Sequence, residues 1–525
     1  MNWTHGTSGL LVAFSISAIA VLAGLAIGRA AAFRLVAFPL IAIPIFIVAV
    51  LLWTVVSGPI KSAAITSHLM PYLGLIFIAI FSGLAGKVIA KLPGKNNHRR
   101  GAMLRELKQG PARRVLRPTG LTLAGQVVPQ CDETKHFKII GTTGTGKSTA
   151  IRELLKGALA RGDRAVIADA DASYVNHFYD PRRGDQILNP FDSRAARWDL
   201  FAEMNARHDA ELLSRSLIAE AEGAEGPWRN YARVFVTSLL RQLHRVQHGD
   251  VAELYSLIST TPVDDLRDLL ADTPAGPYLV QDNGRFFGAV RAVANTHLSA
   301  LEHIARQESR TSLSVRSWIR EGSGVLFLPY QANEIATLRT IISTWMRLAI
   351  YEAMSRPEGD QSLWFAMDEL DALGAIDGLK DALARLRKFG GRCIVGLQSI
   401  AQVSGTYGRA DAQTIVENCG NTLILRCSAS EGGGTARFAS ALIGEREVLR
   451  EQVTKSRGGG VIFASSHRSV STSLQPVTES AVLPSEIEQL PDLQGYLKFA
   501  SRPEWQIVNL RRPDDAIESC SRSGK

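Results

Sequence analysis

The feature that most constrains this chain is a short glycine-rich segment, Gly141-Thr-Thr-Gly144-Thr-Gly146-Lys147-Ser148. It matches the pattern G-x-x-x-x-G-K-[ST], the P-loop of nucleotide-binding proteins. The glycines let the backbone curl so tightly that successive N–H groups converge on a phosphate. In this pattern the lysine reaches the β- and γ-phosphates, and the serine hydroxyl is a ligand of Mg²⁺.

The segments on either side predict the strand and the helix that a P-loop requires. Residues 136–140 (HFKII) form an apolar run typical of a buried strand, and residues 148–160 show the apolar periodicity of a helix. A helix that starts at the phosphate adds its dipole to the anion site. These flanks argue against an accidental match, so we expect ATP and Mg²⁺ to bind here. The expected binding residues are Gly141, Thr142, Thr143, Gly144, Thr145, Gly146, Lys147, Ser148 and Thr149.

A second motif supplies acids. Residues 362–369 (SLWFAMDE) are an apolar run that ends in Asp368 and Glu369, a Walker B pattern. Asp368 would join Ser148 in holding Mg²⁺, and Glu369 would orient and polarise the attacking water. An acidic turn that caps the next helix is the alternative for so short a motif. The P-loop in the same chain favours the Walker B interpretation.

Short apolar strands alternate with helical patterns through the rest of the chain, which predicts an α/β fold with a parallel sheet covered on both faces. Gln398 follows one of these strands, on the side where ligands bind in such sheets. It could contact the γ-phosphate or the catalytic water, or it could be a hydrogen-bonded loop residue; its position fits both equally. The predicted strands are 164–169, 324–330, 362–367, 392–397 and 421–426, and the helices are 333–354, 377–389 and 412–418.

Two other regions differ from this alternation. Residues 205–320 show mostly helical patterns, with candidate helices at 230–246 and 285–304. Residues 456–480 are rich in Gly, Ser and Thr, and they predict a mobile loop before a short final β region.

The first 90 residues predict a membrane anchor. Leu10–Ile27, Leu35–Val56 and Leu69–Ala90 are apolar runs near the roughly 20 residues that span hydrocarbon. Residues 1–90 hold four Lys or Arg and no acid, and residues 91–120 hold nine against one acid. By the positive-inside rule, the chain after the third run is cytoplasmic. A two-span anchor, with one run re-entrant or lying in the interface, stays open.

The net charge of +9 does not indicate a DNA-binding surface by itself. Outside residues 1–120, the chain carries 46 basic and 49 acidic residues, so contacts to DNA would depend on locally placed Lys and Arg. The five cysteines show no metal-ligand spacing.

With these residues in place, the chain resembles the type IV secretion coupling proteins of the TraD/TrwB kind, membrane-anchored relatives of the FtsK and HerA DNA pumps. Four features carry the likeness: a P-loop soon after the anchor, the helical insertion, a series of motifs from Met367 onward, and a late segment, Leu483–Pro491. The motif series reads Met367-Asp-Glu-Leu370, Leu386-Arg-Lys-Phe-Gly390 and Gly396-Leu-Gln-Ser399-Ile-Ala-Gln402, running on to Tyr407-Gly408.

The resemblance implies a RecA-like P-loop NTPase that forms a homo-hexameric ring around a channel, with ATP at the subunit interfaces. It carries catalytic roles to Lys147, Glu369 and Gln398, and it places an arginine finger on Arg387. A surface arginine that favours the helix dipole is the alternative for Arg387. The expected organisation is an anchor (1–90), the first part of the RecA-like domain (91–204), an inserted all-α domain (205–320) and the second part with a β region and tail (321–525).

The resemblance also implies a function at the inner membrane of a bacterium, with a multi-pass anchor and a cytoplasmic motor. Family members usually have two spans, whereas three are counted here. The expected partners are the membrane, single- or double-stranded DNA without sequence preference, the relaxase of a relaxosome and the type IV secretion channel.

The leading hypothesis is an ATPase that delivers single-stranded DNA with bound relaxase to a conjugation channel. The alternatives are a secretion ATPase for protein effectors only, an FtsK-like duplex pump and a non-hydrolysing membrane scaffold. Glu369 and Gln398 argue against the scaffold, which needs neither. The sequence has no H-E-x-x-H motif and no LSGGQ-like signature, which argues against a membrane AAA protease and an ABC transporter.

Overall fold

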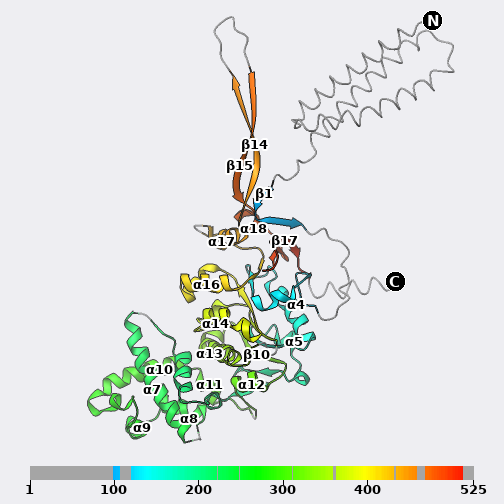
Figure 1. The fold of residues 1–525 in the computed structure, drawn as a ribbon. Coiled ribbons are helices and arrows are strands. Elements are labelled where there is room, and N and C mark those ends of the chain that lie inside the picture. Colours follow the sequence, from blue (N-terminus) through cyan, green and yellow to red (C-terminus); the bar gives the residue numbers. More distant parts are fainter. Residues whose placement is uncertain are drawn as a thin grey trace, which may run out of the picture. The chain divides into compact units, whose positions relative to one another are not determined.

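The chain divides into two compact units, residues 1–98 and 99–525. The three apolar runs that predict the anchor lie outside the residues described here. Within the described part, no helix is both long enough and apolar enough to cross a bilayer. The computed structural model describes residues 98–106, 120–221, 223–246, 249–309, 311–358, 362–430, 433–457 and 468–511 (Figure 1).

The described residues form a large central sheet of ten strands, in the order β2-β17-β16-β13-β5-β12-β11-β6-β10-β7. From β13 to β7 all neighbours are parallel, which confirms the predicted parallel sheet. β16 and β17 add an antiparallel pair beside β13, and β2 joins β17 in parallel. The strands are β2 (Met103–Glu106), β5 (Phe137–Ile140), β6 (Arg164–Ala170), β7 (Gln186–Ile187), β10 (Val325–Tyr330), β11 (Leu363–Met367), β12 (Gly391–Leu397), β13 (Asn421–Ile424), β16 (Gln494–Lys498) and β17 (Glu504–Asn509).

Side chains from the central strands pack into a separate hydrophobic cluster on each face of the sheet. Ile139 of β5 and Ile167 of β6 belong to the cluster with α4 (Lys147–Ala160), while Ile140 and Val166 belong to the other. Because successive strand residues point to opposite faces, this alternation shows that the sheet is covered on both sides. The second cluster includes residues of α13 (Ile335–Ala353), α14 (Leu379–Leu386) and α16 (Arg409–Asn418).

Residues 205–320 are largely helical, as the sequence predicts (Figure 1). The predicted helix 285–304 is wrong at one point, because the helix is interrupted at Ser299 and Ala300. The hydroxyls of Thr296 and Ser299 donate to nearby backbone carbonyls, which competes with helical pairing. The helices are α6 (Asp209–Leu217), α7 (Gly226–Arg245), α8 (Val251–Ser259), α9 (Val263–Leu270), α10 (Gly284–Leu298), α11 (Leu301–Ala305) and α12 (Val315–Glu321).

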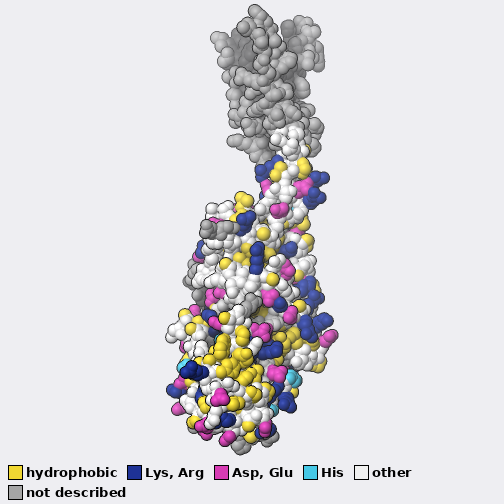
Figure 2. All heavy atoms as spheres, turned by 90° about the vertical axis from the view of Figure 1, so that its left-hand side faces the viewer, with side chains coloured by type: hydrophobic (Ala, Val, Ile, Leu, Met, Phe, Trp, Pro, Cys, Tyr) yellow, Lys and Arg dark blue, Asp and Glu magenta, His cyan; other side chains and the backbone are white. Residues whose placement is uncertain are grey.

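Figure 2 looks onto the side of this insertion and shows hydrophobic side chains gathered among charged ones. Trp228 and Tyr231 of α7 are exposed, and both rings contact the ring of Phe286 on α10, with centroids 5.7 and 5.1 Å away. Aromatic side chains thus join α7 to α10 at the surface.

The prediction of a mobile loop at 456–480 is wrong over residues 456–457 and 468–480. There β15 (Arg468–Ser480) pairs antiparallel with β14 (Glu445–Arg457) in an unbroken ladder, and the hairpin projects from the sheet (Figure 1). The Ser- and Thr-rich composition indicated a loop, but Val and Thr also favour strands. At the base of the hairpin, the buried carboxylate of Glu447 accepts hydrogen bonds from Arg99 and Arg100 of β1 (His98–Gly101).

Candidate nucleotide site

The P-loop lies between the end of β5 and the start of α4, as the sequence predicts. Gly144 and Gly146 take positive φ angles of 79° and 115°, which suit glycine. A Cβ atom on Gly146 would also lie 2.8 Å from Cδ2 of Leu493 and 3.0 Å from Cδ1 of Leu510. The loop therefore needs glycine both for its turn and for its packing.

Backbone hydrogen bonds hold the P-loop from neighbouring segments. The N–H of Gly141 donates to the carbonyl of Leu397 (3.1 Å), and that of Thr142 donates to Arg426 (2.9 Å). The N–H of Leu493 donates to the carbonyl of Thr145 (3.0 Å). Leu493 has a φ of 65°, which residues with a Cβ atom rarely adopt, and it lines the nucleotide pocket. Leu493 was not predicted as a site residue from the sequence, although it follows Asp492, just after the late Leu483–Pro491 segment.

Lys147 is buried, and its Nζ atom donates to the carbonyl oxygens of Gly141 (2.8 Å) and Thr142 (3.3 Å). Burial lowers the pKa of this lysine, and the negative charges of Asp368 and Glu369 oppose that effect. The ammonium is thus held over the loop by the loop's own backbone.

Ser148 and Asp368 are in direct contact. Oγ of Ser148 donates to Oδ2 of Asp368 over 2.7 Å, and the hydroxyl of Tyr174 donates to the same oxygen over 2.8 Å. Oδ1 of Asp368 is buried and has no hydrogen-bond partner among the described residues. An orphaned carboxylate oxygen beside a serine hydroxyl fits Mg²⁺, which takes oxygen ligands and keeps several waters. The predicted metal ligands are therefore brought together.

Glu369 is half-buried and lines the same pocket of about 340 Å³ as the P-loop. Burial raises the pKa of its carboxyl, as do the nearby charges of Asp371 and Asp368, while Lys147 opposes them. The pocket is lined by Thr143, Gly144, Gly146, Lys147, Ser148, Thr149, Arg152, Ala170, Asp171, Ser173, Asp368, Glu369 and Leu493.

Gln398 directly follows β12, and its Nε2 atom donates a hydrogen bond to Oγ1 of Thr143 in the P-loop. It does not line the pocket. The structure thus brings Gln398 to the loop, where it acts as a hydrogen-bonded neighbour, and its catalytic role stays a prediction.

Arg387 lies at the opposite edge of the sheet. It is exposed and begins a single 3₁₀ turn, η8 (Arg387–Phe389), between the end of α14 and the start of β12. The P-loop follows the carboxyl end of β5, the parallel neighbour of β12, so the length of β12, roughly 20 Å, separates the two. Arg387 is therefore placed away from the P-loop of its own chain. A second candidate for the finger is Arg426, which follows β13 on the P-loop side and pairs with Asp492 at 2.7 Å.

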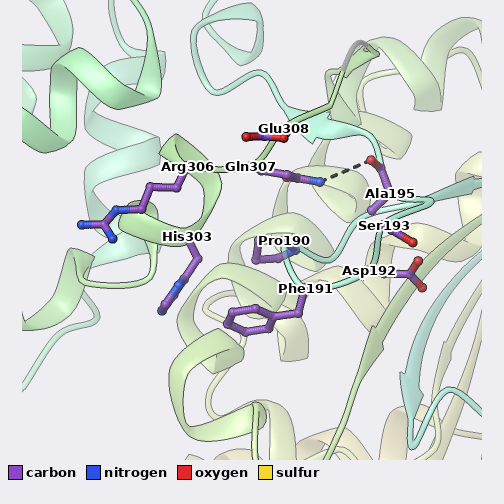
Figure 3. Close-up of a pocket in the computed structure, with 9 residues that line it drawn as sticks. All are labelled: Pro190, Phe191, Asp192, Ser193, Ala195, His303, Arg306, Gln307 and Glu308. Atoms are coloured by element: carbon purple, nitrogen blue, oxygen red, sulfur yellow. Dashed lines mark hydrogen bonds between the residues drawn. The ribbon is translucent and has the colours of Figure 1, made fainter.

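A second cavity, of about 350 Å³, lies apart from the nucleotide pocket (Figure 3). The ring of Phe191 contacts that of His303 in α11, with centroids 4.8 Å apart. Nε2 of Gln307 donates to the carbonyl of Ala195 over 3.3 Å, the contact that Figure 3 marks. These contacts join the end of the helical insertion to the loop that follows β7.

A sequence model described as the type IV secretion-system coupling protein DNA-binding domain matches residues 120–511. The chain belongs to the type IV secretion-system coupling proteins. This confirms the resemblance seen in the motifs.

Two curated relatives show how far the likeness of this coupling protein extends. It is 29% identical to coupling protein TraD of Escherichia coli (strain K12) over 392 residues, which cover 71% of this chain and 54% of TraD. It is 24% identical to protein VirD4 of Rhizobium rhizogenes over 404 residues, covering 72% of this chain and 56% of VirD4. The chain thus spans about half the length of the curated relatives it matches.

Solved structures of the plasmid coupling protein TrwB share the fold. TrwB in complex with ADP and Mg²⁺ has a TM-score of 0.67 and 30% identity, covering 80% of this chain and 94% of that one. TrwB in complex with the GTP analogue GDPNP gives the same score and identity, with 80% and 95% coverage. The coupling protein therefore has a TrwB-like α/β P-loop NTPase fold with a large central sheet.

Proposed function

We propose that this coupling protein is a membrane-anchored, ATP-driven motor that delivers single-stranded DNA, with its bound relaxase, to a type IV secretion channel. The observation that carries the proposal is the complete nucleotide site: Ser148 donates a hydrogen bond to Asp368, and Glu369 lines the same pocket as the P-loop. TrwB, the structural relative, binds ADP with Mg²⁺ and the ATP analogue ADPNP. ATP and Mg²⁺ are accordingly the ligands of this site.

The residues divide the work of phosphoryl transfer among them. The P-loop amides and Lys147 bind the phosphates, and Mg²⁺, when bound, neutralises charge that develops on them. Ser148 and Asp368 would hold the metal and its waters. Glu369 accepts a hydrogen bond from the attacking water and orients it toward the γ-phosphorus. Gln398, next to Thr143, steadies the loop or the water.

The position of Arg387 supports a ring of subunits. Its guanidinium is exposed at the sheet edge away from its own P-loop and donates no hydrogen bond to a described residue. An arginine that lies this far from its own P-loop can contact a bound nucleotide only in a neighbouring subunit. We therefore propose a homo-hexamer with ATP between subunits and the predicted anchor in the inner membrane of a bacterium.

The protein should bind DNA without base preference, because a motor must bind every sequence that it translocates. Such contacts go to phosphates and weaken as salt rises. This property separates the proposed motor from an ATPase for protein effectors alone, which DNA would not affect.

Displacement of streptavidin from biotinylated DNA tests the proposal. The full chain, purified in detergent, should strip streptavidin from single-stranded oligonucleotides of unrelated sequence when ATP is present. It should fail with ADPNP and in the Lys147→Ala variant, because neither permits turnover. Displacement from duplex DNA alone would favour a duplex pump. ATP turnover without displacement from either DNA would reject the DNA motor.

A further inference from the structure

A turn after β6 brings a third segment into the nucleotide site. The buried carboxylate of Asp169 accepts backbone hydrogen bonds from Tyr174 (2.9 and 3.0 Å) and Val175 (2.7 Å). Within the turn, Asp171 and Ala172 have φ angles of 56° and 53°, although neither is glycine. Side-chain-bearing residues rarely adopt this conformation, and it persists where the surroundings impose it. The hydrogen bonds to Asp169 supply that constraint.

The turn aims Tyr174 at the Walker B acid. The tyrosine ring is fully buried, with the guanidinium carbon of Arg152 5.7 Å from the ring centroid. Its hydroxyl donates to Oδ2 of Asp368, the oxygen that also accepts from Ser148. Oδ2 thus takes two donors and Oδ1 takes none from the described residues.

We propose that Tyr174 is a positioning residue for the magnesium site. By holding Oδ2, its hydroxyl fixes the rotation of the Asp368 carboxylate and leaves Oδ1 free for the metal or one of its waters. The serine hydroxyl has one proton and two lone pairs, so it can donate to Oδ2 and still offer an oxygen to the metal. Without the phenol, the carboxylate can rotate and lose this arrangement.

Nucleotide binding with and without metal tests the proposal without relying on hydrolysis. ADP affinity of the full chain is measured in Mg²⁺ and in EDTA for wild type, Tyr174→Phe and Tyr179→Phe. Tyr179 is the matched control, because it lies in the same segment and its hydroxyl makes no hydrogen bond with a described residue. Loss of a residue that orients a metal ligand typically costs about 10–100-fold in metal affinity. We expect Tyr174→Phe to need about tenfold more Mg²⁺ for the same ADP affinity, with metal-free affinity unchanged.

Two results of this titration would overturn the proposal. One is an unchanged Mg²⁺ requirement in Tyr174→Phe. The other is an equal loss of ADP affinity in EDTA, which would mean that the tyrosine only supports the pocket. If Tyr174→Phe does not fold, Asp169→Asn provides a second comparison, because it keeps the phenol and weakens the hydrogen bonds that hold the turn. It also removes a negative charge near Asp368, so its Mg²⁺ requirement is compared with that of Asp171→Asn, and an equal requirement in these two variants would contradict the proposal. Electron paramagnetic resonance of Mn²⁺ bound with ADP supplies a direct second measurement. A Tyr174→Phe spectrum identical to that of the wild type would contradict the proposal.

Discussion

Oγ of Ser148 lies 2.7 Å from Oδ2 of Asp368, although the two residues are 220 positions apart in the chain. Ser148 lies in the first turn of α4, which follows β5 and the P-loop, and Asp368 directly follows β11. In the sheet, β12 lies between β5 and β11. The contact exists because parallel strands end at the same edge of the sheet. This geometry underlies the predictions that follow.

Lys147→Ala should abolish ATP hydrolysis, because the ammonium that neutralises the phosphates is lost. Lys156→Ala is the matched control, since Lys156 lies exposed on the same helix and should leave the rate unchanged. Phosphate release by the two purified variants measures the difference. Wild-type turnover in Lys147→Ala would contradict the P-loop assignment.

Glu369→Gln should bind ATP with near-normal affinity and hydrolyse it about 10²–10⁴-fold more slowly, the usual range for loss of a general base. The amide can hold the water but cannot polarise it as a carboxylate does. Glu321→Gln, at an exposed acid at the end of α12, should behave as wild type. ATP binding and single-turnover hydrolysis separate the two effects, and equal turnover in Glu369→Gln would rule out its proposed role.

Arg387→Ala should lose about 10³–10⁵-fold in rate if Arg387 acts across an interface. Rings mixed from Arg387→Ala and Lys147→Ala subunits should regain activity, because some interfaces then pair an intact P-loop with an intact arginine. Arg385→Ala, at an exposed arginine of α14, controls for the loss of positive charge. Normal hydrolysis by pure Arg387→Ala with DNA present would end the finger hypothesis and leave Arg426 to be tested.

Acid should destabilise the fold through His136. Its buried ring accepts the Cys393 N–H at Nδ1 (3.0 Å) and donates from Nε2 to the Leu383 carbonyl (2.8 Å), so the neutral ring is fully paired. Burial is the main cause that lowers the pKa of His136 to about 4; the charges of Arg387 and Arg392 act in the same direction, and the hydrogen bond to Leu383 opposes them.

The unfolded pKa of histidine is about 6.5, so the unfolded chain binds the proton more tightly. Stability is complete above about pH 6.5 and should fall by about 3 kcal/mol as the pH approaches 4. Urea midpoints at several pH values measure this loss. His136→Gln should remove that part of the slope, whereas His177→Gln, at an exposed histidine, should keep it. An unchanged slope in His136→Gln would show that other groups cause the acid sensitivity.

The sequence predicts the elements around the P-loop well, because strand, loop and helix carry their signals within a few residues of one another. Asp368 was also predictable, since its strand ends in two acids. Tyr174 was not, because its role depends on a turn with positive φ angles at Asp171 and Ala172 that contains no glycine to announce it.

The positions of Leu493 and Arg387 in the fold could not be predicted from the sequence around them either. Leu493 reaches the P-loop only because the strands after it join the sheet beside β13. Leu379, Leu383 and Leu386 are buried along one side of α14, within the predicted helix 377–389. The edge of the sheet at which Arg387 lies depends on how the chain passes from that helix into β12. In the hairpin β14–β15, the Ser- and Thr-rich composition led to the prediction of a loop, although its Val and Thr residues also favour the strand that forms. The domain boundaries and the catalytic roles stay predictions.

DNA-dependent ATP turnover by the full chain tests the central claim most directly. Phosphate release is measured with no DNA and with single-stranded oligonucleotides of unrelated sequence, at about 50 and about 200 mM salt. The proposed motor should hydrolyse ATP faster with every oligonucleotide, and the stimulation should weaken at the higher salt. A rate that DNA leaves unchanged at both salt concentrations, or no ATP hydrolysis under any condition, would contradict it.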